Sequence, residues 1–275
     1  MVSSNLFLVI LIIIIITIFI AVTYRQPSCS ACVRKEHMAT TKTKPIYCLM
    51  VTGKDENRYE FAKISIMNFI IQTYNNKHLL IVNHGTRRLV NNNNNYIKEF
   101  MVSKENKTLG DLRNISLSYV PDGEIFTTWD DDDWRSADYL QQLYDVLITN
   151  NAQLVMLKNR LEYNLNNGSA WKSSLNSGFY WFFMVKDPNL KYDSLDKNED
   201  GIIKTKAYEL HKKIIVYDND PKIYIRYIHK NNTSPYVNKD KANPNPSKGD
   251  YNERAVTEDE RRYLSNIHKY INKAL

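Results

Sequence analysis

Residues 124–134, Glu-Ile-Phe-Thr-Thr-Trp-Asp-Asp-Asp-Asp-Trp, join a short apolar stretch to four consecutive aspartates. The apolar part, Glu124 to Trp129, predicts a buried strand, because β-branched and aromatic residues favour strands. Four adjacent carboxylates repel one another, so a folded site that holds them is expected to supply a counterion. Hard divalent cations such as Mg²⁺ or Mn²⁺ prefer carboxylate oxygens. The sequence therefore predicts a cation or phosphate site at the end of this strand, with a solvated acidic turn as the alternative.

Strand-like and helix-like stretches alternate on both sides of this segment. The expected strands are Ile46–Thr52, Leu79–Val82 and Glu124–Trp129, and the expected helices are Arg58–Tyr74, Leu109–Tyr119 and Ala137–Thr149. This alternation is typical of βαβ units and a largely parallel sheet, in which ligands bind beyond the carboxyl ends of the strands. Those ends carry Thr52-Gly53, Asn83-His84-Gly85 and Asp130 to Asp133. We expect the functional site at this edge of the sheet.

The second half of the chain predicts further strands and two more helices. The expected strands are Gln153–Tyr163, Gly178–Val185 and Lys222–Lys230, and the last of these alternates with period two. The expected helices are Glu199–Lys212 and Thr257–Ala274, and the second has Thr257 and Glu260 at capping-box spacing. Between the last strand and the last helix, Val237–Tyr251 is rich in Pro, Asn and Lys, which indicates a loop.

The N-terminal residues include a long apolar run. From Leu6 to Val22 the only polar residue is Thr17, which predicts a helix of roughly 26 Å, near the lower limit for crossing hydrocarbon. We interpret residues 1–24 as a retained single-pass transmembrane anchor, with a cleaved signal peptide as the alternative. Basic residues follow this segment and none precedes it. The positive-inside rule therefore favours a cytoplasmic position for the rest of the chain, and the secretory lumen is the alternative.

Composition excludes several classes of protein. The 275-residue chain carries 37 Lys and Arg against 30 Asp and Glu, and this modest excess of +7 does not indicate a nucleic-acid partner. Three cysteines exclude a disulfide scaffold, and 43% hydrophobic residues exclude global disorder. We expect four regions, namely an anchor at 1–24, a stem at 25–44, an α/β domain at 45–236, and a loop and helix at 237–275.

Two readings compete for the acidic segment at the start of the Glu199–Lys212 helix. Asp196, Asn198 and Asp200 have the spacing of the first ligands of an EF-hand calcium loop, but Ala207 stands where that loop needs a bidentate Glu. In the other reading, Glu199 and Asp200 are a catalytic carboxylate pair. The dipole of a helix N-terminus favours the ionised form that a general base requires.

Single residues elsewhere are further candidates. His229 ends the alternating strand, where a neutral imidazole could ligate a metal, although a lone histidine is more often structural. Arg113, on the helix after Leu109-Gly110, could reach a phosphate or a nucleobase, although such a position is normally a surface one.

Taken in chain order, several of these segments resemble the family 2 glycosyltransferases of the GT-A fold. The resembling segments are Ile46–Thr52, Ile70-Ile71-Gln72-Thr73-Tyr74, Leu80–Thr86, Leu109–Asn114, Phe126–Trp134, Asp138-Tyr139-Leu140, Glu199-Asp200, Tyr224–His229 and Asn231–Ser234. Two residues depart from the family pattern. His84 stands where the family often has an Asp that reads the nucleobase, and Ala137 replaces a common Pro. These residues therefore do not assign the nucleobase of the donor.

The resemblance implies a Rossmann-like, mostly parallel mixed sheet flanked by helices, so that residues 45–236 would be a GT-A domain. It also implies a membrane-anchored inverting transferase that uses a nucleotide-diphosphate sugar and Mn²⁺ or Mg²⁺. The acceptor would be a hydroxyl group of a glycan, lipid or protein, and no nucleic acid would be involved. A catalytically inactive carbohydrate- or nucleotide-binding membrane protein of the same fold is the alternative.

The resemblance also implies roles for particular residues. Asp132 would be the principal metal ligand, Asp130 would contact the ribose or bridge to the metal, and His229 would approach the metal or the diphosphate. Further donor-binding candidates are Thr52, Gly53, Arg113 and Asp131. Asp200, with Glu199 as the alternate, would deprotonate the acceptor hydroxyl for in-line attack on the anomeric carbon.

Overall fold

The computed structural model describes residues 43–53, 58–91, 94–103, 105–179, 182–211, 213–230, 232 and 251–274. The expected anchor at 1–24, nearly all of the stem at 25–44 and the loop from Val237 to residue 250 lie outside the described residues. Within the part of the chain that is described, no helix combines the length and the apolar character needed to cross a membrane. Thr43–Leu275 belong to one unit of the fold.

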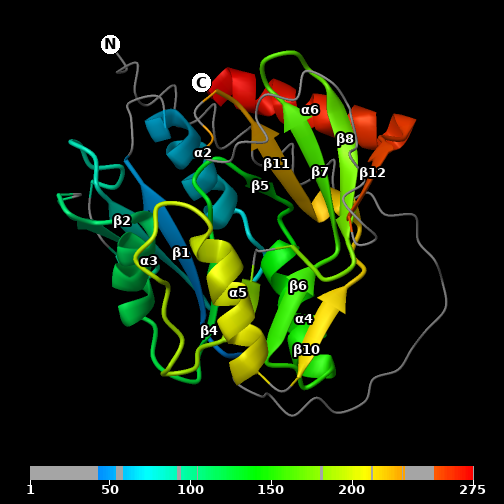
Figure 1. Cartoon of the computed structure of the whole chain (residues 1–275). Helices are drawn as coiled ribbons and strands as arrows, with labels where there is room; N and C mark the ends of the chain where they lie inside the picture. The colour runs from blue at the N-terminus through cyan, green and yellow to red at the C-terminus, as the bar shows by residue number, and fades with distance from the viewer. Residues whose placement is uncertain are drawn as a thin grey trace. The chain divides into compact units, whose positions relative to one another are not determined.

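A seven-stranded sheet forms the centre of this unit (Figure 1). Its strands, in spatial order, are β10 (Ile214–Tyr217), β6 (Leu154–Leu157), β9 (Phe182–Val185), β4 (Ile125–Thr128), β1 (Ile46–Thr52), β2 (Lys77–Asn83) and β3 (Ile97–Met101). Strand β9 is antiparallel to β4 and β6, whereas the other neighbours run parallel. The expected mixed, mostly parallel sheet is therefore confirmed.

Helices cover both faces of this sheet. They are α2 (Arg58–Ile70), α3 (Leu109–Ser118), α4 (Tyr139–Thr149) and α5 (Glu199–Leu210). Cys48 and Met50 of β1 belong to the apolar cluster that α2 and α4 complete, and Leu49 belongs to the cluster that α3 and α5 complete. Because successive residues of a strand point to opposite faces, a strand buried on both sides is apolar throughout. This explains the continuous apolar run at Ile46–Thr52.

A second sheet of five strands carries part of the predicted site. Its order is β12 (Tyr251–Ala255), β8 (Ala170–Leu175), β7 (Asn159–Asn164), β11 (Tyr224–Ile228) and β5 (Trp134–Arg135), and a 3₁₀ turn, η1 (Pro221–Ile223), precedes β11. Helix α6 (Glu258–Ala274) runs alongside this sheet in Figure 1. Its residues Leu264 and Ile267 share an apolar cluster with Trp134, Ile225 and Ile64, so α6 joins the second sheet to α2.

The prediction of one strand at Gln153–Tyr163 is wrong. The segment forms β6 and β7, which belong to different sheets and are separated at Lys158. The side-chain oxygen of Asn219 accepts hydrogen bonds from the backbone N–H groups of Lys158 (3.1 Å) and Asn159 (3.0 Å). These bonds hold the chain where it crosses between the sheets. Lys158-Asn159-Arg160 interrupts the apolar run at this point, but such an interruption does not by itself distinguish polar positions within one strand from a crossing between two sheets.

Other expected elements are shorter than predicted. Helix α2 ends at Ile70 rather than Tyr74, because Gln72 and Thr73 turn towards the segment before α4. The Gln72 side chain accepts a hydrogen bond from the Leu140 N–H (3.1 Å), and the Thr73 N–H donates to the Ala137 carbonyl (2.7 Å). The predicted capping box at the start of α6 is confirmed by reciprocal bonds between Thr257 and Glu260.

Candidate active site

The four aspartates lie directly after β4, at the carboxyl edge of the central sheet. Thr52 ends β1 beside them, α5 begins with Glu199 and Asp200, and β11 leads into His229 (Figure 1). The structure thus brings the predicted site residues from four separate segments to one region. Each aspartate nevertheless has different partners, so the four carboxylates have different structural surroundings.

Asp131 is the most deeply buried of the predicted donor-binding residues, with 1% of its surface exposed. Its Oδ2 atom accepts hydrogen bonds from Thr52 Oγ1 (2.7 Å) and Arg58 Nε (3.1 Å), and its Oδ1 atom accepts one from Arg58 Nη2. Burial raises the pKa of Asp131, although the Arg58 charge opposes this rise. Asp131 and Thr52 therefore tie the ends of β4 and β1 together, and their predicted contact with a donor stays a prediction.

Asp132 and His229, the two residues to which the resemblance gives metal-binding roles, are in direct contact. The Nε2 atom of His229 lies 3.1 Å from Asp132 Oδ2, and the Phe61 ring stacks on the imidazole with 4.7 Å between ring centroids. Asn232 donates to the same oxygen (3.3 Å) and accepts a bond from the His229 backbone N–H (2.6 Å). This arrangement gives a structural reason for the motif that links the histidine to the following asparagine.

The surroundings of Asp132 favour its ionised form although it is buried. Burial alone would raise its pKa, but the nearby Arg58 guanidinium and the hydrogen bond from His229 outweigh burial and hold the pKa well below its usual range. Among the described residues, hydrogen bonds reach Oδ2 of this carboxylate and not Oδ1. A carboxylate that stays charged and keeps one oxygen available suits a divalent cation.

The donor set therefore fits the metal that the resemblance implies. A carboxylate suits Mg²⁺ or Mn²⁺, and a neutral imidazole favours Mn²⁺ of the two. No group of three or more His, Cys, Asp or Glu side chains with metal-holding geometry occurs in the described part of the chain. Asp132 and His229 would thus be two protein ligands, and oxygens of the substrate and of water would complete the coordination.

The Arg113 guanidinium lies beside carboxylates from two segments. Its Nη2 atom lies 3.6 Å from Asp130 Oδ1 and 3.4 Å from Asp200 Oδ1, and its Nε atom lies 3.4 Å from Glu199 Oε1. The alternative that Arg113 occupies an ordinary surface position is wrong, because its side chain is 12% exposed. Its predicted contact with a nucleotide is a separate matter and stays a prediction.

Neighbours of Arg113 on α3 explain how it reaches α5. Gly110 donates its backbone N–H to the Leu195 carbonyl (2.9 Å), and a Cβ atom at Gly110 would overlap the carbonyl of Asp193. Asn114 exchanges two hydrogen bonds of 2.9 Å with the backbone of Tyr192. The Gly-Asp-Leu-Arg-Asn motif thus docks the segment before α5 against α3, and this docking brings Arg113 to Glu199 and Asp200.

Asp200 and Glu199 differ in access. Glu199 is 3% exposed, whereas 36% of the Asp200 side chain is exposed. Burial of the carboxyl group raises the pKa of Asp200 to about 7; Arg113 opposes the rise, and Glu199 and Asp130 add to it. We expected the helix dipole to favour the ionised form, but burial and the neighbouring carboxylates outweigh it. Part of the Asp200 side chain is thus accessible although Oδ1 is buried, and the raised pKa suits a general base.

Asp133 is held by hydrogen bonds from the second sheet. It is buried and accepts hydrogen bonds from the Tyr224 hydroxyl (2.5 Å) and the Tyr227 backbone N–H (3.1 Å), both on β11. Burial, together with the charges of Asp132 and Asp130, raises its pKa to about 7. Asp133 therefore joins the acidic segment to the second sheet.

The inference that the aspartates need an added counterion is too strong. Arg58 pairs with Asp131 and Asp132, and Arg113 lies beside Asp130. A third guanidinium, that of Arg135, is buried against the Trp129 ring at 4.2 Å from its centroid. The protein itself supplies positive charge at the acidic segment, so repulsion between the aspartates does not by itself demonstrate a metal.

Gly53 acts through its backbone. Its φ angle is +103°, and a Cβ atom there would overlap the backbone nitrogen of Gly85 at the end of the neighbouring strand. The His84 N–H also donates to the Thr52 carbonyl (3.0 Å). The turns after β1 and β2 are therefore packed against each other, which explains why a glycine follows each strand.

The residues of the EF-hand alternative do not act together. Asp196 Oδ1 accepts a hydrogen bond from the Leu109 N–H (3.1 Å), whereas Asp200 pairs with Arg113 from the first turn of α5. Asn198 has a left-handed backbone, with φ of +65°, and precedes that helix. The two carboxylates thus have separate partners, and the geometry does not favour a calcium loop.

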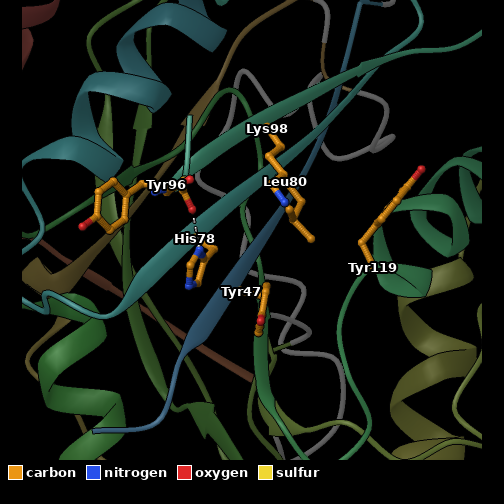
Figure 2. Close-up of a pocket in the computed structure, with 7 residues that line it drawn as sticks. Tyr47, His78, Leu80, Tyr96, Lys98 and Tyr119 are labelled. Carbon is orange, nitrogen blue, oxygen red and sulfur yellow. Dashed lines mark hydrogen bonds between the residues drawn. The ribbon is translucent and has the colours of Figure 1, made fainter. Parts of the chain in front are cut away.

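Figure 2 shows a hollow elsewhere on the central sheet, with a volume of about 170 Å³. It is lined by Tyr47, His78, Leu80, Asn95, Tyr96, Lys98 and Tyr119. Tyr47 and His78 lie near the beginnings of β1 and β2, whereas the predicted site lies near the strand ends. The hollow contains none of the predicted site residues.

Sequence reasoning missed Arg58, which contacts two of the four aspartates. The sequence did offer one indication of Arg58, namely its position. Arg58 begins the first helix after the strand that leads into Thr52-Gly53. A basic residue at a helix start is unusual in electrostatic terms, because the helix dipole favours anions there. Such a residue indicates a nearby acidic group.

Comparison with known proteins agrees with this fold. Residues 57–232 match the family described as Glycosyl transferase family 2, which is more than half of the chain. The chain belongs to the family 2 glycosyltransferases. It is therefore a glycosyltransferase, and its described part has the mixed α/β, GT-A-like fold that the resemblance implies.

One curated relative and two solved structures illustrate the likeness. Glycosyltransferase GlyA of Streptococcus pneumoniae serotype 4 (strain ATCC BAA-334 / TIGR4) is 24% identical, over 58% of this chain and 28% of that protein. The structure of S. aureus TarS 1-349 with UDP-GlcNAc has a TM-score of 0.54 and 15% identity, over 68% of this chain and 60% of that one. The mannosyltransferase PcManGT from Pyrobaculum calidifontis, with GDP-Man and Mn²⁺, has a TM-score of 0.51 and 14% identity, over 70% and 59%. The chain thus spans about a quarter of that relative and three fifths of the solved chains.

Proposed function

We propose that this glycosyltransferase is a metal-dependent inverting enzyme that transfers a sugar from a nucleotide-diphosphate sugar to a hydroxyl group of a glycan, lipid or protein. The nucleotide-sugar complexes of TarS and PcManGT support this class of donor, and the second of them also contains Mn²⁺. One of these donors carries uridine and the other guanosine, so they favour neither nucleobase here.

One observation carries the proposal. The Arg113 guanidinium lies 3.6 Å from Asp130, the predicted donor residue, and 3.4 Å from Asp200, the predicted base. Asp132 lies two residues after Asp130 in the chain and contacts His229. Donor binding and proton removal are therefore assigned to neighbouring groups, as transfer between two bound substrates requires.

The chemistry assigned to these residues is a single displacement. Asp200 accepts the proton of the acceptor hydroxyl while the hydroxyl oxygen bonds to the anomeric carbon and the bond from that carbon to the diphosphate oxygen breaks. Arg113 holds Asp200 in place and opposes the rise in its pKa, so that the base is available near neutral pH. A divalent cation held by Asp132 and His229 would stabilise the negative charge on the leaving diphosphate.

We further propose that residues 1–24 anchor the enzyme in a membrane and that the catalytic domain faces the cytoplasm, with the secretory lumen as the other orientation. The apolar run from Leu6 to Val22 and the basic residues after it support this proposal. A membrane position would also bring a lipid or membrane-bound glycan acceptor within reach.

The test uses the full chain in detergent micelles and a panel of nucleotide sugars, with binding and transfer measured separately. We expect donor binding to require Mn²⁺ or Mg²⁺, to be lost in EDTA and to be lost in Asp132→Ala. We expect Asp200→Asn to bind donor but not to transfer sugar. Donor affinity that is unchanged by EDTA would refute the metal-dependent form, and binding without turnover across the panel would favour the inactive binding protein.

A further inference from the structure

Arg58 occupies a position at the acidic segment that the proposed mechanism does not use. It is the first residue of α2, and its side chain is 12% exposed. Nε and Nη2 both bond to Asp131, and Nη2 also donates to Asp132 Oδ2 at 3.0 Å. One guanidinium therefore links Asp131 to Asp132, the predicted metal ligand.

Three groups lie within hydrogen-bond distance of Asp132 Oδ2. Besides Arg58, they are the His229 ring nitrogen at 3.1 Å and the Asn232 amide at 3.3 Å. A carboxylate oxygen has two lone pairs, so Arg58 and Asn232 alone already fill it. A cation that binds both oxygens of Asp132 must displace at least one of these two donors, whereas a cation that binds His229 and Oδ1 displaces the His229 contact.

Of the three donors, Arg58 carries the permanent positive charge. A divalent cation beside Asp132 would repel the guanidinium, whereas it has no net charge to repel on the Asn232 amide. Arg58 also has two bonds to Asp131, so it can lose its bond to Asp132 and remain anchored. His229 differs again, because its ring nitrogen is itself a candidate ligand.

We infer that Arg58 and the divalent cation compete for Asp132. In the metal-free protein Arg58 neutralises the acidic segment, and on metal binding it releases Asp132 while it keeps Asp131. This inference rests on the proposed function, because it takes Asp132 as the metal ligand. It assigns Arg58 as a residue that sets the metal affinity of the site and keeps the acidic segment folded without metal.

The direct test measures Mn²⁺ affinity of the full chain in detergent by the electron paramagnetic resonance signal of free Mn²⁺. Arg58→Gln removes the charge but keeps an amide that can donate to Asp131. We expect the Kd for Mn²⁺ to fall about tenfold or more in Arg58→Gln, because the competing cation is gone. Arg262→Gln is the matched control, since Arg262 is exposed on α6 and its loss changes net charge equally. We expect it to leave the Kd unchanged.

The results that would contradict this inference differ from those that would contradict the proposed function. An unchanged or weaker Mn²⁺ affinity in Arg58→Gln would overturn the competition and leave Asp132 as a metal ligand. Mn²⁺ binding that persists in Asp132→Asn would instead refute the metal site of the proposed function, whatever Arg58 does. Binding in Arg58→Gln but not in the unaltered chain would support competition in its strongest form and contradict the proposed metal dependence.

Thermal unfolding gives a second readout that does not depend on activity. Without metal, Arg58→Gln should lower the Tm, because Asp131 and Asp132 lose their shared counterion. Saturating Mn²⁺ should then raise the Tm of Arg58→Gln more than it raises that of the unaltered chain, as linkage requires. An equal rise in both would contradict the inference.

Arg58→Lys keeps the test decisive if Arg58→Gln does not fold. Lysine retains the charge but lacks the planar pair of donors that grips Asp131. We expect its Mn²⁺ affinity to stay within about threefold of that of the unaltered chain, because charge is what opposes the cation. A gain of tenfold in Arg58→Lys would mean that hydrogen-bond geometry, and not charge, limits metal binding, and would overturn the inference.

Discussion

The ring nitrogen Nε2 of His229 lies 3.1 Å from Asp132 Oδ2, although 97 residues separate the two in the chain. The pairing of β11 with β5 brings them together, since Ile225 lies opposite Trp134 in an antiparallel register. Just beyond this pairing, the backbone N–H of Tyr227 donates to the side chain of Asp133. The predicted metal ligands therefore depend on the second sheet as much as on the first.

Asp200→Asn should abolish transfer while sparing donor binding. The amide cannot accept the proton of the acceptor hydroxyl, and we expect kcat to fall by about 10²- to 10⁴-fold. Glu199→Gln is the matched variant in the adjacent position, and its effect should be smaller because Glu199 is 3% exposed. Turnover assays with parallel donor-binding titrations measure both. A larger loss in Glu199→Gln would reverse the assignment of the base.

Activity should rise with pH through the pKa of Asp200, which burial of the carboxyl group raises to about 7. A general base works in its ionised form, so kcat/KM should be low well below pH 7 and level off above it. Arg113 opposes this raised pKa, so Arg113→Met should move the acidic limb of the profile to higher pH. A limb that stays in place in Arg113→Met would show that Arg113 does not control the base.

Gly53→Ala should destabilise the fold more than Gly123→Ala. Both glycines have positive φ angles, +103° and +80°, but only at Gly53 would a Cβ atom overlap backbone, whereas nothing lies within 4 Å at Gly123. Backbone strain alone costs about 1–3 kcal/mol. We expect Gly123→Ala within that range and Gly53→Ala about 2 kcal/mol beyond it, because steric overlap adds to the strain. Urea unfolding measures both, and equal losses would contradict the close packing of the two turns.

Leu264→Ala should destabilise the catalytic domain although Leu264 lies near the C-terminus. Its side chain is 2% exposed in the cluster that α6 shares with α2 and the second sheet. Truncation of a buried leucine costs about 2–5 kcal/mol. Ile148→Ala is the control, because Ile148 is 48% exposed on α4, and its cost should be within about 0.5 kcal/mol. A separate unfolding transition for α6 would contradict its place in the domain.

Much of the central sheet could be predicted because its strands are buried on both faces. Such strands leave continuous apolar runs, as at Ile46–Thr52, and the helices between them leave a period near 3.6. The acidic segment could be recognised from its composition. Four aspartates after an apolar strand are rare, and their chemistry is specific.

The second sheet was harder to predict because its strands carry mixed patterns. Ala170–Leu175 is mostly half-buried and polar, and Trp134–Arg135 is a strand of two residues. The counterions were harder still. Arg58 and Arg113 lie on different helices, and only the fold shows that both guanidinium groups face the acidic segment.

The pairing of aspartates with arginines has an evolutionary consequence. The Asp131 carboxylate is buried and pairs with Arg58, so loss of Arg58 would remove its counterion. Removing one partner of a buried ion pair is strongly destabilising, whereas replacing both by apolar groups is often tolerated. We therefore expect positions 58 and 131 to change together in related sequences. Asp132 should stay fixed when both have changed, because the proposed function makes it a metal ligand.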